Sequence, residues 1–106
     1  MRYVLNSPVL TGYGSWEFSG PISIDEARRF LRREDFQSAV GHESTAQLLS
    51  DLLGQEIPLR RRGIAMEPGD TALVFRLKDR LPEGQILSMS SLGSQSYEFG
   101  VLRRLS

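Results

Sequence analysis

The single histidine of this sequence, His42, is the side chain best suited to proton transfer. It follows Gly41 at the predicted start of a helix. Free backbone amides at a helix N-terminus attract anions such as phosphate, and an imidazole gains and loses a proton near neutral pH. His42 is therefore a candidate general acid or base acting on a phosphate group. A histidine with only a structural role would have the same sequence context.

Two other polar segments have the chemistry to bind a phosphate or a sugar. Arg80 and Glu83 lie on a loop constrained by proline and glycine, where an Arg fork can hold phosphate oxygens and the carboxylate can orient it. Asn6 and Ser7 end the first predicted strand with short polar side chains. Each segment also has a simpler interpretation. The first would be an exposed loop with a weak ion pair, and the second a turn closed by side chains.

The densest basic run of the chain is Arg60-Arg61-Arg62. We interpret it as a solvated or edge face of a strand, with phosphate steering or an acidic partner as alternatives. The pair Gly12 and Gly14 begins like a dinucleotide-binding fingerprint, but Glu17 occupies the third glycine position. No strand–turn–helix pattern surrounds it, so we interpret this segment as a loop between strands.

The composition excludes several classes of site. The chain has 106 residues, 13 Lys and Arg, 13 Asp and Glu, one His and no Cys. The lack of Cys excludes disulfides, thiolate zinc sites and cysteine nucleophiles, and one His excludes a histidine metal cluster within a subunit. The zero formal net charge argues against a protein that coats long nucleic acid. We predict neither a metal nor a cofactor.

Length and hydropathy indicate a single domain over residues 1–106, because two cores of half this size would be close to the lower limit for folding. No run of about 18 apolar residues is present, and the chain opens directly into a foldable segment. We expect a soluble cytoplasmic protein without a membrane partner, located in the host cytoplasm if a phage encodes it.

The first predicted helix has a clear start signal. Ser23 followed three residues later by Glu26 forms a capping box, in which the two residues satisfy each other's free amides. The helix is predicted to run to about Arg33, with apolar residues three and four positions apart on one face. Its arginines, Arg28 among them, are predicted to face outward.

The remaining elements follow from shorter patterns. Strands are predicted over residues 3–5, 15–19, 36–40, 71–77 and 97–102, with a further extended segment over 57–66. A second helix is predicted from 42 or 44 to a stop at Gly54, and a short helix over 88–94. Gly20 and Pro21 are predicted to end the second strand, and a turn at 67–70 to make residues 60–77 a hairpin. Hairpins together with helical crossovers predict an α/β fold, a mixed sheet of about five strands with flanking helices in a single compact domain.

These segments together resemble the ring nucleases of viruses and mobile elements, an anti-CRISPR family that degrades cyclic tetra-adenylate. The resemblance spans nearly the whole chain. The segments that carry it, in this order and spacing, are Tyr3–Ser7, Gly41–Ala46, Pro68–Asp70 with the strand Ala72–Leu77, and Arg80–Gly84.

The resemblance implies a homodimer whose ligand, a ring of four adenylates, lies in a pocket at the subunit interface. His42 matches the family's histidine, and Asn6 matches the polar end of its first strand. Arg80 and Glu83 match an Arg and a Glu of the loop that covers the ligand. Cleavage in the family needs no metal and gives linear di-adenylates through a cyclic-phosphate intermediate. This removes the second messenger that activates type III CRISPR effectors.

On this basis we expect His42 to act as general acid, Arg80 to stabilise the phosphate, Glu83 to orient a group or transfer a proton, and Asn6, Ser7 and Arg76 to contact the ligand. Two other functions remain open. One is a non-catalytic protein of a phage or mobile element that sequesters a cyclic oligonucleotide or binds another protein. The other is a small nucleic-acid-binding protein that uses Arg60-Arg61-Arg62, against which the balanced charge argues.

Overall fold

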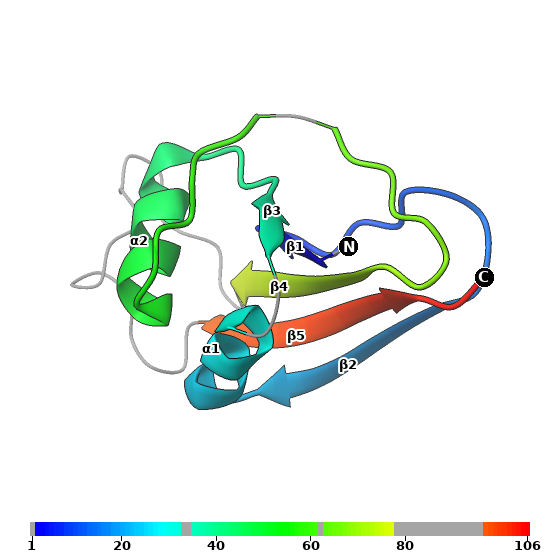
Figure 1. Cartoon of the computed structure of the whole chain (residues 1–106), viewed down its shortest axis with the longest axis horizontal. Helices are drawn as coiled ribbons and strands as arrows, with labels where there is room; N and C mark the ends of the chain where they lie inside the picture. The colour runs from blue at the N-terminus through cyan, green and yellow to red at the C-terminus, as the bar shows by residue number, and fades with distance from the viewer. Residues whose placement is uncertain (1, 33–34, 62, 78–96) are drawn as a thin grey trace.

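The computed structural model describes residues 2–32, 35–61, 63–77 and 97–106. In chain order the elements are β1 (Arg2–Leu5), β2 (Trp16–Ile22), α1 (Ile24–Arg32), β3 (Phe36–Ser38), α2 (Glu43–Leu53), β4 (Thr71–Leu77) and β5 (Tyr97–Arg104), as Figure 1 shows. The predicted α/β fold is confirmed. The helix predicted over 88–94 lies outside the described residues.

The five strands form one mixed sheet in the order β2-β5-β4-β1-β3. β1 pairs in parallel with β3 on one side and with β4 on the other. β5 runs antiparallel to both β4 and β2. β3 and β4 run parallel to each other on either side of β1. Parallel strands need a crossover connection, and the chain passes from β3 to β4 through the helix α2.

The hairpin predicted over residues 60–77 is wrong. Its turn is present, since the Asp70 amide donates to the Glu67 carbonyl at 2.9 Å. However, β1 and β5 occupy the two edges of β4, which leaves no edge for the preceding segment. Leu59 instead forms an isolated parallel bridge with Val40, just beyond β3.

The predicted strand break at Gly20 and Pro21 is also wrong, because β2 continues to Ile22. Among the described strands, β2 lies at the edge of the sheet and pairs with β5 alone. A proline, which has no amide hydrogen, is tolerated at such an edge. Gly20 and Pro21 do interrupt the regular pairing, since the register of β2 against β5 shifts between Ser19 and Ile22.

The start of α1 agrees with the predicted capping box. The Glu26 amide donates to the Ser23 hydroxyl at 3.1 Å, and that hydroxyl lies 3.3 Å from a Glu26 carboxylate oxygen. The outward orientation of Arg28 is wrong, because its guanidinium donates twice to the Leu52 carbonyl, at 3.0 and 2.8 Å. A cation here satisfies a carbonyl left free at the C-terminal end of α2.

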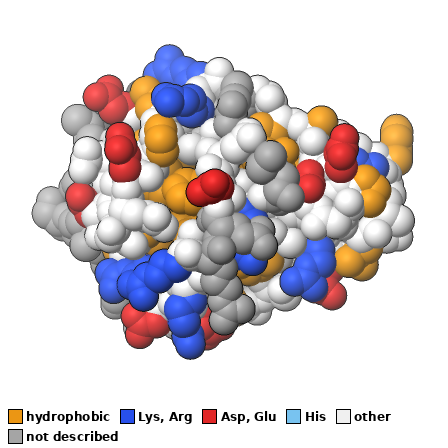
Figure 2. All heavy atoms as spheres, in the orientation of Figure 1, with side chains coloured by type: hydrophobic (Ala, Val, Ile, Leu, Met, Phe, Trp, Pro, Cys, Tyr) orange, Lys and Arg blue, Asp and Glu red, His pale blue; other side chains and the backbone are white. Residues whose placement is uncertain are grey.

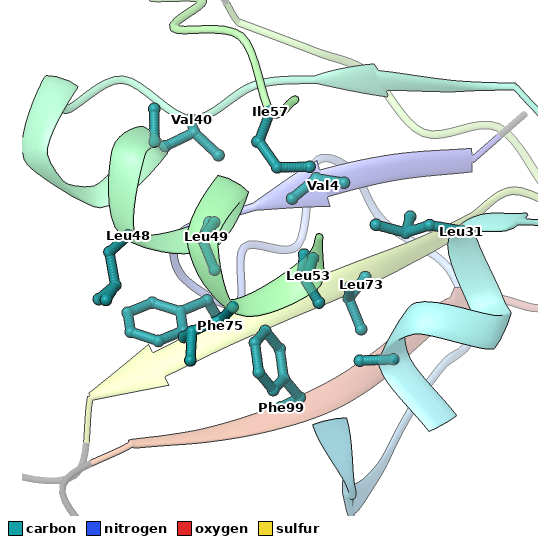
Figure 3. Close-up of a cluster of buried hydrophobic side chains, with 13 residues drawn as sticks. Val4, Leu31, Val40, Leu48, Leu49, Leu53, Ile57, Leu73, Phe75 and Phe99 are labelled. Atoms are coloured by element: carbon teal, nitrogen blue, oxygen red, sulfur yellow. The ribbon is translucent and has the colours of Figure 1, made fainter. Parts of the chain in front are cut away.

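The helix α2 ends as predicted at Gly54, whose φ of 69° lies in the left-handed region and whose amide donates to the Ser50 carbonyl. Both helices cover the same face of the sheet, as the close-up in Figure 3 shows. The cluster on this face consists of buried apolar residues of the helices and of three strands: Ala27, Leu31, Ala46, Leu48, Leu49, Leu52, Leu53, Val4, Leu73, Phe75 and Phe99, with Val40 and Ile57. We call this side of the sheet the helix face.

The opposite side of the sheet, which we call the open face, has a smaller core. Its buried members are Tyr3, Leu5, Ala72, Val74 and Leu102 of the strands, together with Met66. Trp16, Ala39 and Ile64 pack against them and are partly exposed. Within the described residues, this face is covered by loop segments and not by a helix.

Arg104, the last residue of β5, lies near the start of β4, since the two strands are antiparallel. Its side chain contacts several loop segments there. Its guanidinium donates to the carbonyls of Met66, Tyr13 and Ser106, the latter two at 2.8 and 3.3 Å. It also lies 5.4 Å from the centre of the Trp16 ring. One planar fork therefore holds three chain segments together.

The substitution Arg104→Lys tests this junction. We expect the free energy of unfolding to fall by about 1–3 kcal/mol, because an ammonium cannot reach all three carbonyls. Urea denaturation followed by circular dichroism measures the change. Arg103→Lys is the matched control, since Arg103 and Glu17 are exposed and 3.7 Å apart, and its effect should stay below about 0.5 kcal/mol. Equal stability of Arg104→Lys and the wild type would contradict this role.

Candidate functional site

The predicted site residues of the described chain lie after or near the carboxyl ends of three parallel strands. β3, β1 and β4 run in the same direction, so their carboxyl ends meet at one edge of the sheet. Asn6 follows β1, His42 lies between β3 and α2, and Arg76 is the penultimate residue of β4. Ligands of open α/β sheets bind at this edge, and we call it the carboxyl edge.

His42 is the N-cap residue of α2. Its backbone is extended, with φ −123° and ψ 128°, and its side chain makes no capping hydrogen bond. Its carbonyl accepts the first helical hydrogen bond, from Ala46 at 2.9 Å. The side chain is exposed. The imidazole therefore stands at the amide end of the helix and is accessible to a ligand.

The side chain of Arg61 contacts the residue before this histidine. Arg61 was not among the predicted site residues. Its Nε donates to the carbonyl of Gly41 at 3.0 Å, directly before His42. Arg61 is an exposed residue, and its guanidinium can still donate from its two terminal nitrogens. Arg60 differs, because its side chain turns back to the carbonyl of the neighbouring Leu59. The third residue of the run, Arg62, lies outside the described residues.

A buried serine holds the segment that carries Arg61 against β3. The Ser38 hydroxyl donates to the Pro58 carbonyl at 2.6 Å and accepts from the Val40 amide at 3.3 Å. One step further along, the Arg60 amide donates to the Val40 carbonyl at 2.9 Å. These contacts bring residue 61 to the start of α2, although the two are far apart in the sequence.

Together, these groups form a candidate site for an anion. Helix amides favour negative charge, a guanidinium offers a planar fork for phosphate oxygens, and the imidazole can donate a proton. The positive charge is local. On the side of the molecule in Figure 2, arginine side chains lie among Asp and Glu side chains. Of this group, only the histidine was a predicted site residue, and phosphate steering by the basic run was left as an alternative. The contact between Arg61 and Gly41 leaves no signal in the local sequence.

Asn6 and Ser7 border a cavity of about 200 Å³ on the open face of the sheet. The exit of β3 forms another wall with Ala39, whose amide donates to the Val4 carbonyl at 2.9 Å. The lining also includes the apolar side chains of Leu5, Val9 and Ile64. A polar rim over an apolar floor is typical of a small-molecule site, so the structure places both predicted residues at a cavity.

The remaining predicted site residues are Arg76, Arg80 and Glu83. Arg76 makes an ion pair with Glu98 of β5, with 2.7 Å between Nη1 and Oε1. Arg80 and Glu83 lie outside the described residues, so their roles remain predictions.

Within residues 2–32, 35–61, 63–77 and 97–106, no group of three His, Asp or Glu side chains is arranged to hold a metal ion. None of the helices in these ranges is long and apolar enough to cross a membrane.

The fold and this edge define a single-domain α/β protein with a candidate anion site at the carboxyl edge of a mixed sheet. Comparison with known proteins then gives its family. A model of the STIV B116-like family matches residues 2–99, and the chain belongs to this family.

Its relatives occur in viruses and in a bacterium. Protein 26 of Sulfolobus islandicus filamentous virus is 40% identical over 90 residues, covering 82% of this chain and 76% of the relative. YddF of Bacillus subtilis is 36% identical over 103 residues, covering 95% and 94%. ORF117 of Acidianus two-tailed virus is 33% identical over 87 residues, covering 79% and 74%. None of these names states an activity.

The solved structure of B116 of Sulfolobus turreted icosahedral virus shows the same fold. It superposes with a TM-score of 0.73 over 97% of this chain and 98% of that chain, at 23% identity. The comparisons therefore show a family and a fold, and the chemistry of the site has to be argued from this chain's own residues.

The buried hydroxyl of Ser38 is tested by Ser38→Ala. We expect the free energy of unfolding to fall by about 1–3 kcal/mol, because the Pro58 carbonyl and the Val40 amide each lose a hydrogen bond. Denaturant unfolding measures it, with the exposed Ser7→Ala as the control, for which the change should be within about 0.5 kcal/mol. If both variants unfold at the same denaturant concentration, the hydroxyl does not fix this segment.

Proposed function

We propose that this protein is a ring nuclease, a metal-independent phosphodiesterase that cleaves cyclic tetra-adenylate to linear di-adenylates and so switches off type III CRISPR signalling. The observation that supports it best is the pairing of an exposed His42 at a helix N-terminus with Arg61 bound to the preceding carbonyl. The proposed phosphate-binding cation thus contacts the residue directly before the proposed proton donor. The identity of the substrate is inferred from the resemblance of the sequence to ring nucleases.

In the proposed reaction, the substrate supplies its own nucleophile. The ribose 2′-oxygen bonds to the adjacent phosphorus, the bond from phosphorus to the 5′-oxygen breaks, and the product ends in a cyclic phosphate. His42 gives its proton to the departing 5′-oxygen, and Glu83 is the proposed acceptor of the 2′-hydroxyl proton. Holding these atoms in line lowers the barrier by several kcal/mol.

Cations stabilise the crowded phosphate in this scheme. Arg61 approaches it from the start of α2, and Arg80, which follows β4 in the sequence, is proposed to supply a second guanidinium. Asn6 and Ser7 would hold a neighbouring sugar or phosphate at the cavity after β1.

The proposal includes a homodimer. A two-fold axis places one His42 on each of two opposite sides of a ring of four nucleotides. Each imidazole then protonates the leaving oxygen of one cleavage. A dimer with one histidine per chain can therefore cleave the ring at two positions and release two di-adenylates. The binding partners we propose are therefore cyclic tetra-adenylate and a second copy of the chain.

Removal of the imidazole is the first test of this function. In His42→Ala we expect single-turnover cleavage to slow by at least about 100-fold, the scale for losing a general acid, with ligand affinity close to wild type. Labelled cyclic tetra-adenylate is incubated with excess protein in EDTA, and the products are resolved by chromatography. His42→Asn is the matched control for folding, because Asn is a good N-cap residue but cannot act as the acid.

Three results would contradict parts of the proposal. Unchanged cleavage by His42→Asn would remove the imidazole from the mechanism. Activity lost in EDTA and restored by Mg²⁺ or Mn²⁺ would overturn the metal-independent reaction. Tight binding by the wild-type protein without products would favour a protein that sequesters the ring.

The second test separates Arg61 from its neighbour in the same basic run. In Arg61→Ala we expect kcat/KM for the cyclic substrate to fall by roughly 10- to 100-fold, the scale for one hydrogen bond to a charged group. Arg60→Ala removes the same charge from a side chain bound to Leu59, so its effect should be several-fold smaller. Equal losses in the two variants would indicate general electrostatic attraction and not a specific contact.

A further inference from the structure

An exposed aromatic ring lies on the open face of the sheet, away from His42. Phe18 of β2 is 48% exposed although its ring rests against β5. A Cβ at residue 100 would lie 2.7 Å from the Phe18 Cε1, so only the glycine that is present lets the ring approach the strand. The ring is thus supported by the backbone of β5 while much of its surface remains accessible.

The ring borders a cavity of about 160 Å³ whose lining also includes an ion pair. Phe18, Gly100, Arg76 and Glu98 all line it. The pair is positioned by the sheet, because Arg76 and Glu98 are directly opposite each other in the register of β4 and β5. The Glu98 side chain is 22% exposed and the Arg76 side chain 53%, so both remain accessible to a ligand.

This arrangement matches the chemistry of one nucleobase. A flat aromatic ring stacks on any base. Next to it, the Glu98 carboxylate only accepts hydrogen bonds and the Arg76 guanidinium only donates them. Adenine presents an amine donor at N6 beside an acceptor at N7, whereas guanine presents two acceptors, O6 and N7. Guanine would place O6 against the carboxylate.

We propose that this cavity is an adenine-binding subsite, in which the base stacks on Phe18, its N6 amine donates to Glu98 and its N7 accepts from Arg76. The assignment rests on the proposed function for the source of the adenine, a base of the cyclic ligand. It gives Arg76, expected from the sequence to contact the ligand, a specific contact to a base and not to a phosphate.

The position of the subsite suits a ligand that also reaches the cavity at Asn6. Glu98 and Gly100 alternate with buried residues of β5 and lie on the same face as Leu102. Leu5, which lines the cavity at Asn6, belongs to this face too. β5 and β1 are separated by β4 alone, about 10 Å at the usual strand spacing. Neighbouring nucleotides of a single ring can span that distance.

The binding test uses the full chain and two free nucleotides, 5′-AMP and 5′-GMP, followed by amide chemical shifts. We expect AMP to shift Phe18, Glu98 and Gly100 and to bind more tightly than GMP. Phe18→Leu keeps an apolar side chain over Gly100 but removes the stacking face, so AMP affinity should fall about 5- to 100-fold. Phe18→Tyr should retain it.

Two further variants make the test specific. Glu98→Gln offers a donor as well as an acceptor, and should therefore reduce the preference for AMP over GMP. Leu105→Ala is the control, because Leu105 is an exposed apolar residue, 53% accessible, just beyond the other end of β5. Its AMP affinity should equal that of the wild type.

The outcomes separate this subsite from the proposed function. AMP binding that depends on Phe18, in a chain that neither binds nor cleaves cyclic tetra-adenylate, would support the subsite and contradict the function. Cleavage by the wild type with full ring affinity in both Phe18→Leu and Glu98→Gln would overturn the subsite alone. Shifts confined to residues around His42, or equal affinity for GMP, would also overturn it.

Discussion

The parallel pairing of β1 on both sides is the constraint on which the candidate site depends. β1 has four residues, yet it lies between β3 and β4 and runs in the direction of both. Three carboxyl ends therefore meet at one edge. The crossover from β3 to β4 must begin at that edge, and because the crossover is a helix, a helix N-terminus with its free amides begins there as well. His42 occupies that position.

A second constraint is the buried anchor of the segment that carries Arg61. Ile57 is almost completely buried in the helix-face core, and its amide donates to the Ser50 hydroxyl of α2 at 2.9 Å. The chain then runs along the exit of β3 to Arg61, whose side chain contacts Gly41. An exposed guanidinium, which gains little from any single surface ion pair, is thus brought to the imidazole by apolar burial several residues earlier. The burial of Ile57 therefore positions the Arg61 guanidinium, and this cation does not have to contribute to the stability of the fold.

The sequence was informative where one segment determines its own structure. Ser23 and Glu26 mark the start of α1, Gly54 marks the end of α2, and the apolar spacing of both helices identifies their buried sides. It was uninformative where the partner is distant. The strong apolar run of β4 does not reveal that its edges are taken by β1 and β5, so a local hairpin was predicted instead. The contact of Arg61 with Gly41 and that of Phe18 with Gly100 are likewise products of tertiary structure. The roles of Arg80 and Glu83 and the homodimer stay predictions.

The distribution of charge over the two sites follows the chemistry of the proposed ligand. The chain has no net charge, so a cationic site has to be assembled locally. Near His42 the Arg61 guanidinium is bound to a neutral carbonyl and keeps its positive charge for an anion. At the cavity beside Phe18, Glu98 neutralises Arg76 and leaves a donor next to an acceptor. A nucleotide has a charged phosphate and a neutral base with donors and acceptors at its edge. One positive site beside β3 and one neutral, polar site on β2, β5 and β4 suit these two parts, whereas a uniformly basic surface would bind phosphates without distinguishing the bases.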